Sequence, residues 1–125
     1  MATKYERSWL TLKSKISEAE LNNAVVYLLT MLLPEGLKIE IPQSPINVPW
    51  KAQLAFVDRE PLANYAHSCR YILFNVETGQ SQSIEAQFPP FGRINKNRWI
   101  IIHKAPGVPD TALAVKQEAK FEEKE

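Results

Sequence analysis

The only cysteine of the chain, Cys69, stands two residues after one of its two histidines, His67. A nucleophilic thiolate needs a base within reach and a neighbouring cation or helix N-terminus that lowers its pKa. On an extended strand the two residues would share one face, with ~7 Å between their Cα atoms. This spacing therefore allows the two side chains to contact each other but does not require it. The alternative is that Cys69 is a buried strand residue and His67 a surface residue of the preceding loop. The sequence favours this alternative.

Acidic and basic side chains crowd the end of an expected strand, at Asp58, Arg59 and Glu60. Asp58 could be a site carboxylate, either in a polar recognition loop or in a pocket with His67 and Cys69. The alternative is a solvated turn, whose exposed ion pairs contribute little to stability. The sequence favours the turn, so a catalytic role for Asp58 is the secondary interpretation.

Metal and cofactor sites are not predicted. A structural zinc site usually takes four ligands in short paired spacings such as C-x2-C, and the chain has one cysteine and two histidines. His67, Cys69 and His103 could meet only if the last expected strand lay beside the one that begins at Cys69. The four glycines are scattered, and none stands in the spacing of a phosphate-binding loop. We therefore expect no metal and no cofactor, and we lean against enzyme activity.

Aromatic residues and prolines gather in the segments that link the expected elements. Trp50 ends NVPW, Tyr65 lies in PLANYAH, and Phe91 follows two prolines in FPPFGR. If these loops meet at one end of a sheet they form an aromatic rim, and tryptophan and tyrosine are over-represented at interface hot spots. The aromatic side chains could instead close the ends of the core. An exposed strand edge would offer a partner a second surface, by addition of an extended segment.

Residues 91–99 concentrate basic side chains, with Arg93, Lys96 and Arg98 between Phe91 and Trp99. Cations beside aromatic rings can bind phosphates and stack on bases. Three charges are a small footprint, however, and the net charge of +1 adds no support. Binding of RNA or single-stranded DNA is therefore the weakest of the hypotheses.

Length and composition are typical of one globular domain: 125 residues, 45% of them hydrophobic and 23% charged. The most apolar run, residues 24–33, is about half of the ~20 residues that a membrane span needs. Residues 1–10 lack the apolar core of a signal peptide, and one cysteine cannot form an intramolecular disulfide. We expect a cytoplasmic protein that does not enter a membrane.

The main helix is expected at about 17–33. Ser17 and Glu20 form a capping box, apolar residues follow at helical spacing, and Pro34 ends the helix because it lacks an amide proton. A shorter amphipathic helix is expected within 4–16, where aromatic and aliphatic residues recur every three or four positions.

Strands are expected at about 37–41 and 81–88, where apolar and polar residues alternate. Strands are also expected at about 51–58, 69–76 and 98–104, where short runs carry apolar residues on both faces. Three prolines make residues 42–50 a loop or an edge. No helical pattern separates these strands, which favours antiparallel pairing between them.

The fold class that follows is α+β. We expect an N-terminal helix, about 17–33, packed on a curled antiparallel sheet of about four to five strands. This order of elements resembles the cystatin-like class of folds, and the resemblance implies a sheet curled around the helix. Residues 1–109 form the domain, and the charged residues of 110–125 form a flexible or helical tail.

The first functional hypothesis is a small non-catalytic interaction module that binds a protein or peptide through the aromatic and proline-rich rim or a sheet edge. The residues expected to contact the partner are Trp50, Asp58, Arg59, Tyr65, His67, Phe91 and Arg93. The alternative is a small enzyme or ligand-binding protein with a pocket between helix and sheet that uses Asp58, His67 and Cys69. The weaker alternative is RNA or single-stranded DNA binding through 91–99. A homodimer stays open.

Overall fold

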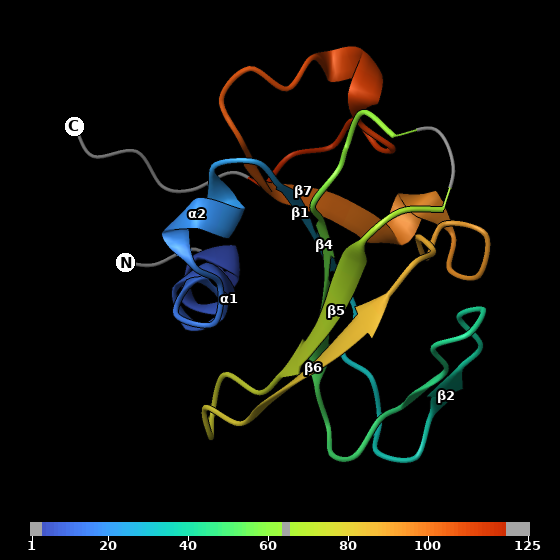
Figure 1. Cartoon of the computed structure of the whole chain (residues 1–125). Helices are drawn as coiled ribbons and strands as arrows, with labels where there is room; N and C mark the ends of the chain where they lie inside the picture. Colours follow the sequence, from blue (N-terminus) through green and yellow to red (C-terminus); the bar gives the residue numbers. More distant parts are fainter. Residues whose placement is uncertain (1–3, 64–65, 120–125) are drawn as a thin grey trace.

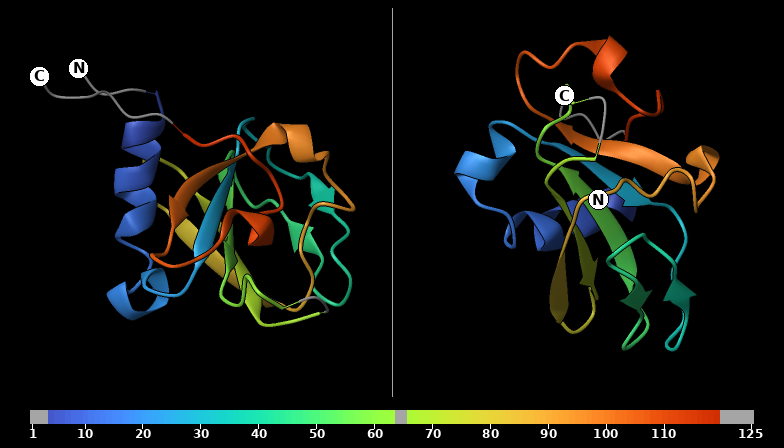
Figure 2. Two further views of the ribbon diagram at one scale, coloured as in Figure 1. Left: turned by 90° about the horizontal axis from the view of Figure 1, so that it is seen from above. Right: turned by 45° about the vertical axis from the view of Figure 1, so that its right-hand side comes forward.

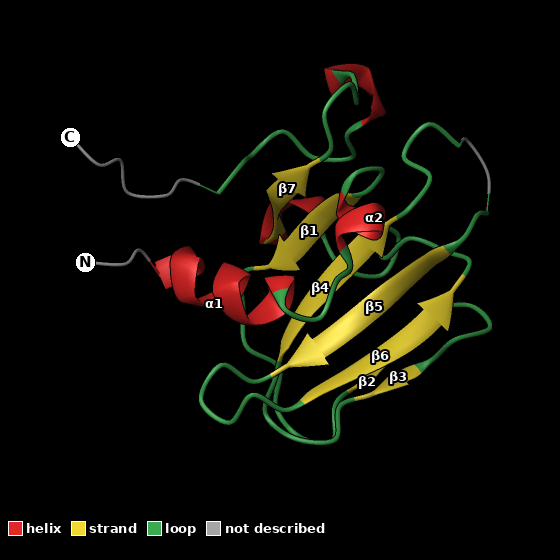
Figure 3. Ribbon diagram, turned by 60° about the vertical axis from the view of Figure 1, so that its left-hand side comes forward, coloured by secondary structure: helices red, strands yellow, loops and turns green. Residues whose placement is uncertain are grey.

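A five-stranded antiparallel sheet forms the centre of the computed structural model, which describes residues 4–63 and 66–119 (Figure 1). Its strands lie side by side in the order β6-β5-β4-β1-β7 (Figure 3). Their bounds are β1 Val25–Leu29, β4 Gln53–Asp58, β5 Cys69–Phe74, β6 Ser81–Ala86 and β7 Trp99–Lys104. A short hairpin of β2 (Lys38–Ile39) and β3 (Ile46–Asn47) forms a separate two-stranded sheet. The α+β class and the antiparallel sheet are therefore confirmed.

The expected helix at 17–33 is wrong beyond its first turn. Its capping box exists, because Ser17 Oγ accepts a hydrogen bond from the Glu20 amide at 3.1 Å. Helix α2 nevertheless spans only Glu18–Leu21, and the apolar run that follows is strand β1. Every residue of β1 is buried, since the strand lies in the sheet interior with both faces covered. Such a strand is apolar at consecutive positions and loses the alternation that would distinguish it from a buried helix.

The main helix is instead α1, Lys4–Lys13, within the shorter helix expected at 4–16. Its Leu12 is fully buried, and its Ser8 donates a 2.9 Å hydrogen bond to Gln53 Oε1 at the start of β4. The Trp9 ring stacks on His103 of β7, with 5.6 Å between the ring centroids. Helix α1 therefore contacts the sheet at both β4 and β7. No described helix has the length and apolar character to cross a membrane.

Four of the expected strands are present with slightly shorter bounds, as β4, β5, β6 and β7. The strand expected at 37–41 is reduced to the two residues of β2, and its partner β3 comes from the proline-rich segment 42–50. β1, β4, β5 and β6 pair consecutively, whereas β7 returns to the far side of β1. The chain therefore departs from a simple meander at its last strand.

Two hydrophobic cores lie on the two faces of the main sheet. Helix α1 and the β2–β3 hairpin lie on opposite sides of this sheet (Figure 2). The first core lies under the β2–β3 hairpin and the loop 88–95, and the second core lies under α1 and α2. Alternate residues of β1 supply both: Tyr27 points into the first core and Val26 into the second. This three-layer arrangement explains why the central strands are apolar at successive positions.

The segment 113–119, here called the C-terminal strap, lies along the outer edge of β7. The Ile101 amide donates to Gln117 O, and the Ala119 amide donates to Ile101 O, each at 2.8 Å. Upstream, Val115 is buried in the first core, while Ala119 packs against the second. Residues 110–119, expected in a charged tail, thus pack on the sheet after a short 3-10 turn at 110–112. Residues 120–125 lie outside the described part of the chain.

Candidate functional site

Asp58 and His67 form a close pair at one end of the main sheet. His67 Nε2 lies 2.8 Å from Asp58 Oδ1, and the two side chains are 9% and 12% exposed. Asp58 ends β4, and its Oδ1 also accepts from the Glu60 amide at 3.1 Å, which defines the turn that follows. The His67 amide donates to Gln87 O at 3.0 Å, which holds the histidine segment against the segment after β6. The pair is therefore built into the end of the sheet.

Cys69 lies beside this pair but in an environment that suppresses thiolate formation. It is opposite Asp58 in the β4–β5 register and is fully buried. Burial, reinforced by the negative charge of Asp58, raises the pKa of its thiol to about 12. The thiol contacts the Phe88 carbonyl oxygen, with 3.7 Å between sulfur and oxygen. An active nucleophilic cysteine needs the opposite combination, an exposed thiol with a lowered pKa.

Native Cys69 should therefore react slowly with a disulfide reagent such as Ellman's reagent. At mildly alkaline pH we expect a rate about a hundredfold or more below that of the urea-unfolded chain, because the thiolate is scarce and access needs local opening. Absorbance stopped-flow on the native and unfolded protein measures both rates. Equal rates would show that the thiol is accessible and would return Cys69 to the candidate nucleophiles.

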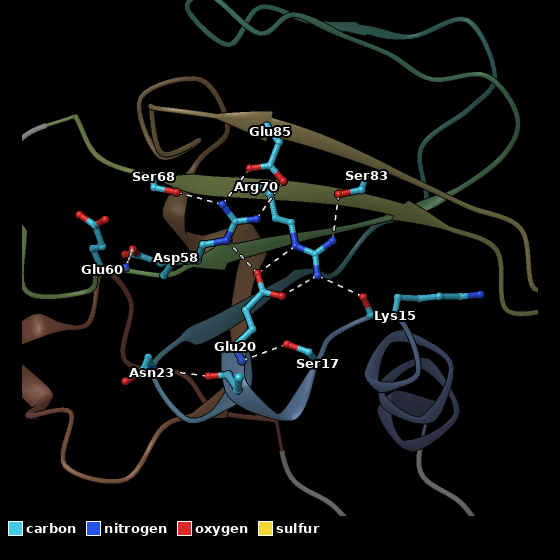
Figure 4. Close-up of polar contacts among 12 residues, drawn as sticks. Lys15, Ser17, Glu20, Asn23, Asp58, Glu60, Ser68, Arg70, Ser83 and Glu85 are labelled. Atoms are coloured by element: carbon cyan, nitrogen blue, oxygen red, sulfur yellow. Dashed lines mark hydrogen bonds and ion pairs between the residues drawn. The ribbon is translucent and has the colours of Figure 1, made fainter.

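Arg59, the residue after Asp58, contacts Glu85 of β6, Glu20 of α2 and Ser68 of the segment before β5 through its guanidinium group. Figure 4 shows these three partners together with Arg70. Its two Nη atoms donate to both carboxylate oxygens of Glu85, each at 2.8 Å. Its Nε donates to Glu20 Oε2 at 2.9 Å, and Nη1 also donates to Ser68 Oγ at 2.9 Å. The hydrogen bonds to Glu85 and Glu20 raise the pKa of Arg59 above its usual value. The side chain is occupied by partners within its own chain.

Arg70 on β5 completes the cluster from the other side of Glu20. Its Nε and Nη2 donate to the two oxygens of Glu20 at 3.0 and 2.7 Å, and Nη1 reaches Ser83 Oγ at 2.9 Å. Both Arg70 and Glu20 are largely buried, with side chains 13% and 15% exposed. We call Glu20, Arg59, Arg70 and Glu85 the arginine–glutamate cluster. It connects α2 to β4, β5 and β6.

The carboxylates of the cluster are held in their charged form. Burial alone would raise the pKa of Glu20, but hydrogen bonds from Arg70 and Arg59 outweigh it and the pKa is lowered. The pKa of Glu85 is lowered chiefly by its hydrogen bonds from Arg59. Because each arginine has a carboxylate partner, the cluster offers little free charge to a ligand. Its role is to fix α2 on the sheet.

The remaining residues expected at the rim are distributed over the molecule. Trp50 is half-buried against the first core and precedes β4, whose six residues separate it from Asp58 by about 20 Å. Phe91 lies within the first core, with its ring edge-on to Tyr27 and Trp99 at centroid distances of 5.2 and 5.7 Å. Its ring therefore closes the core. Tyr65 lies outside the described residues.

Arg93 is exposed and lines a groove of about 500 Å³ that opens beside β2. We call this the β2 groove. Its apolar lining consists of Leu29, Met31, Leu33, Leu37, Ile39 and Ile94, and its polar lining of Lys38, Glu40, Arg93, Asn95 and Arg98. Leu29 and Leu33 are buried in the first core, whereas Met31 and Leu37 are 41% and 38% exposed. The groove thus has an apolar floor and an accessible apolar mouth.

A second hollow, of about 480 Å³, lies between α1 and the start of β4. It is lined by Ser8, Gln53 and Phe74, at the end of the sheet opposite to Asp58 and Cys69. The pocket expected from Asp58, His67 and Cys69 does not coincide with it. Within residues 4–63 and 66–119, no three His, Cys, Asp or Glu side chains gather in a group that could hold a metal ion.

Comparison with known proteins gives no relative. No family model, no curated protein and no solved structure matches this chain. The resemblance in element order to the cystatin-like folds therefore stays a prediction, and function has to be argued from the site itself.

Two features of the site were not expected from the sequence. Glu20 and Arg70 are 50 residues apart and were assigned to a helix cap and a strand. One signal was present, since Arg70 shares a strand face with the apolar Ile72 and Phe74. A buried cation among apolar residues needs a carboxylate partner. The β2 groove had no such signal, because Met31 and Leu37 belonged to the expected helix and strand.

Proposed function

We propose that this protein is a non-catalytic interaction module that binds an extended segment of a protein partner in the β2 groove. The observation that supports this proposal is the accessible apolar surface there. Met31 and Leu37 are exposed at the mouth of a channel whose floor is formed by core residues. Exposed apolar surface rimmed by polar side chains is typical of binding sites for proteins. The single cysteine of the chain is a buried free thiol. A free thiol fits a reducing, cytoplasmic setting, which we include in the proposal.

Peptide binding in the β2 groove is a better-supported function than binding of nucleic acid by the loop 91–99. Stacking with bases needs exposed aromatic faces. Trp99 is only 1% exposed, and Phe91 is half-buried against other rings. An enzyme that uses Asp58, His67 and Cys69 is disfavoured by the raised pKa of the thiol. For a homodimer, the outer edge of β6 is the surface that we propose, because β6 is the last strand of the sheet on that side.

Selection from a displayed library of random linear peptides tests the proposed function. Peptides retained by the wild-type protein should bind at least about tenfold more weakly to the double variant Met31→Ser/Leu37→Ser, because it removes the exposed apolar mouth. Leu32→Ser is the matched control: Leu32 is 54% exposed but lines the hollow beside α1. Affinities measured by fluorescence anisotropy should be unchanged in this control. Recovery of no peptide, or equal binding to the double variant, would refute the proposal.

A further inference from the structure

One edge of β2 borders the groove and has backbone groups directed away from β3. The amide of Val48, the residue after β3, donates to Leu37 O at 2.9 Å, so the Leu37 carbonyl is directed toward the β3 side. In an antiparallel pair alternate residues turn their N–H and C=O groups to the partner strand. The N–H and C=O of Lys38 therefore point away from β3, and Lys38 lines the groove. An extended chain laid in the groove could pair with this edge, as in recognition by strand addition.

The apolar floor determines which side chain such a segment would insert. Leu29, Leu33 and Ile39 are 1%, 3% and 7% exposed, so the bottom of the groove belongs to the packed core. Side chains of an extended segment point to opposite faces in alternation. A segment paired with β2 would therefore place one aliphatic residue on the floor and direct its two neighbours outward, toward the rim.

Two cations on the rim have no partner of opposite charge within the described part of the chain. Arg93 and Arg98 form no ion pair with any carboxylate of the described residues. The guanidinium of Arg98 contacts the Met31 sulfur, with 3.4 Å between Nη1 and the sulfur. Of the groove charges only Lys38 and Glu40 pair with each other, at 3.5 Å. By contrast, both arginines of the arginine–glutamate cluster are satisfied. Two free guanidinium groups favour carboxylates, which they bind through two parallel hydrogen bonds.

We propose that the partner segment is acidic: an extended stretch in which an aliphatic residue is flanked by Asp or Glu. Its backbone pairs with the Lys38 edge of β2, its aliphatic side chain enters the groove floor, and its carboxylates contact Arg93 and Arg98. This inference rests on the proposed function and adds the chemistry of the ligand to it. Exposed ion pairs are weak individually, so the aliphatic contact and the backbone pairing supply most of the affinity and the arginines supply selectivity.

The test uses the full chain and a labelled, end-blocked peptide in which Leu alternates with Asp and Glu. A matched peptide carries Asn and Gln in place of the acids. Anisotropy titrations should give about tenfold tighter binding of the acidic peptide, and the difference should shrink at high salt. The variant Arg93→Gln/Arg98→Gln should bind both peptides alike. Arg7→Gln is the control, because Arg7 is an exposed arginine on α1, outside the groove; this variant should keep the tenfold difference.

The outcomes separate the two proposals. Equal binding of both peptides, lost in Met31→Ser/Leu37→Ser, would overturn the acidic ligand and retain the groove as a peptide site. Binding of neither peptide, together with an empty library selection, would overturn both proposals. If single-stranded oligothymidine displaced the acidic peptide and bound more tightly through the same arginines, the partner would be a nucleic acid and the inference would be wrong. N-methylation of each backbone amide of the acid–Leu–acid core, one at a time, should weaken binding at the position that donates to the Lys38 carbonyl; unchanged affinity at every position would refute the strand pairing.

Discussion

Replacing Glu20 by Gln should lower the free energy of unfolding by about 2–3 kcal/mol, because it leaves two arginines without their shared carboxylate. Glu20 accepts from Arg59 at 2.9 Å and from Arg70 at 2.7 and 3.0 Å. The loss affects Arg70 more than Arg59, because the Arg70 side chain is largely buried. Its remaining partners, Ser83 Oγ and Lys15 O, are uncharged. Arg59 retains Glu85. Most of the penalty therefore falls on the buried guanidinium of β5.

Urea unfolding at neutral pH measures this change as a shift of the transition midpoint. Glu18→Gln is the matched control, because Glu18 lies on the same short helix with its side chain exposed. The free energy of unfolding of this control should differ from that of the wild type by less than about 0.5 kcal/mol. If the two variants unfold at the same urea concentration, the arginine–glutamate cluster contributes nothing and α2 is held by apolar contacts alone.

The pH dependence of the same cluster has a defined sign. The folded-state pKa values of Glu20 and Glu85 lie below the ordinary value of 4.5. Their stabilising effect is therefore complete above pH 4.5 and is lost as the pH falls through the lowered values, where both carboxylates take up protons. The difference in stability between wild type and Glu20→Gln should accordingly be largest near neutrality and shrink as the pH falls below 4.5. A constant difference over that range would contradict the ionic origin of the effect.

Deleting the C-terminal strap should be the other strongly destabilising change. Truncation after residue 112 removes the two backbone hydrogen bonds at Ile101 and the bond from the Ala114 amide to Tyr27 Oη, which is 3.1 Å long. It also exposes the core surface that Val115 covers. The expected loss is about 3 kcal/mol, from one buried aliphatic side chain and three hydrogen bonds of modest net value. The uncovered edge of β7 should in addition promote self-association.

Thermal unfolding and light scattering measure these two effects. The control is truncation after residue 119, which retains every one of the contacts named for the strap. It should unfold like the full chain and scatter as the same species. If the shorter truncation behaved like this control, the strap would be a passive surface segment and the edge of β7 would need no cover.

The parts of the fold that the sequence predicts are those in which one pattern determines one structure. β4, β5, β6 and β7 follow the expected strands because turn residues bound each run and limit it to the length of a strand. Val25–Leu29 could not be assigned in this way. Both faces of β1 are buried, so the pattern is apolar throughout, and only its pairing with β4 and β7 identifies it as a strand.

The candidate site was less accessible to sequence reasoning, for a topological reason. Asp58 and His67 are nine residues apart, and the turn between two expected strands could bring them together. The β2 groove instead joins the end of β1, the edge of β2 and the loop that carries Arg93 and Arg98. These three segments are adjacent only because β7 crosses to the far side of β1. The spacing of residues within any one of these segments does not indicate that the three are adjacent.

The order of the strands also has a consequence for biosynthesis. β1 lies between β4 and β7, yet residues 99–119 are translated some seventy residues after β1 itself. β1, β4, β5 and β6 can pair while the chain is still attached to the ribosome, which leaves one edge of the most apolar strand, VVYLL, open to solvent and to other nascent chains. Translation pausing before residue 99 should therefore raise the demand for chaperones, whereas emergence of residues 99–119 closes the edge in a single late step.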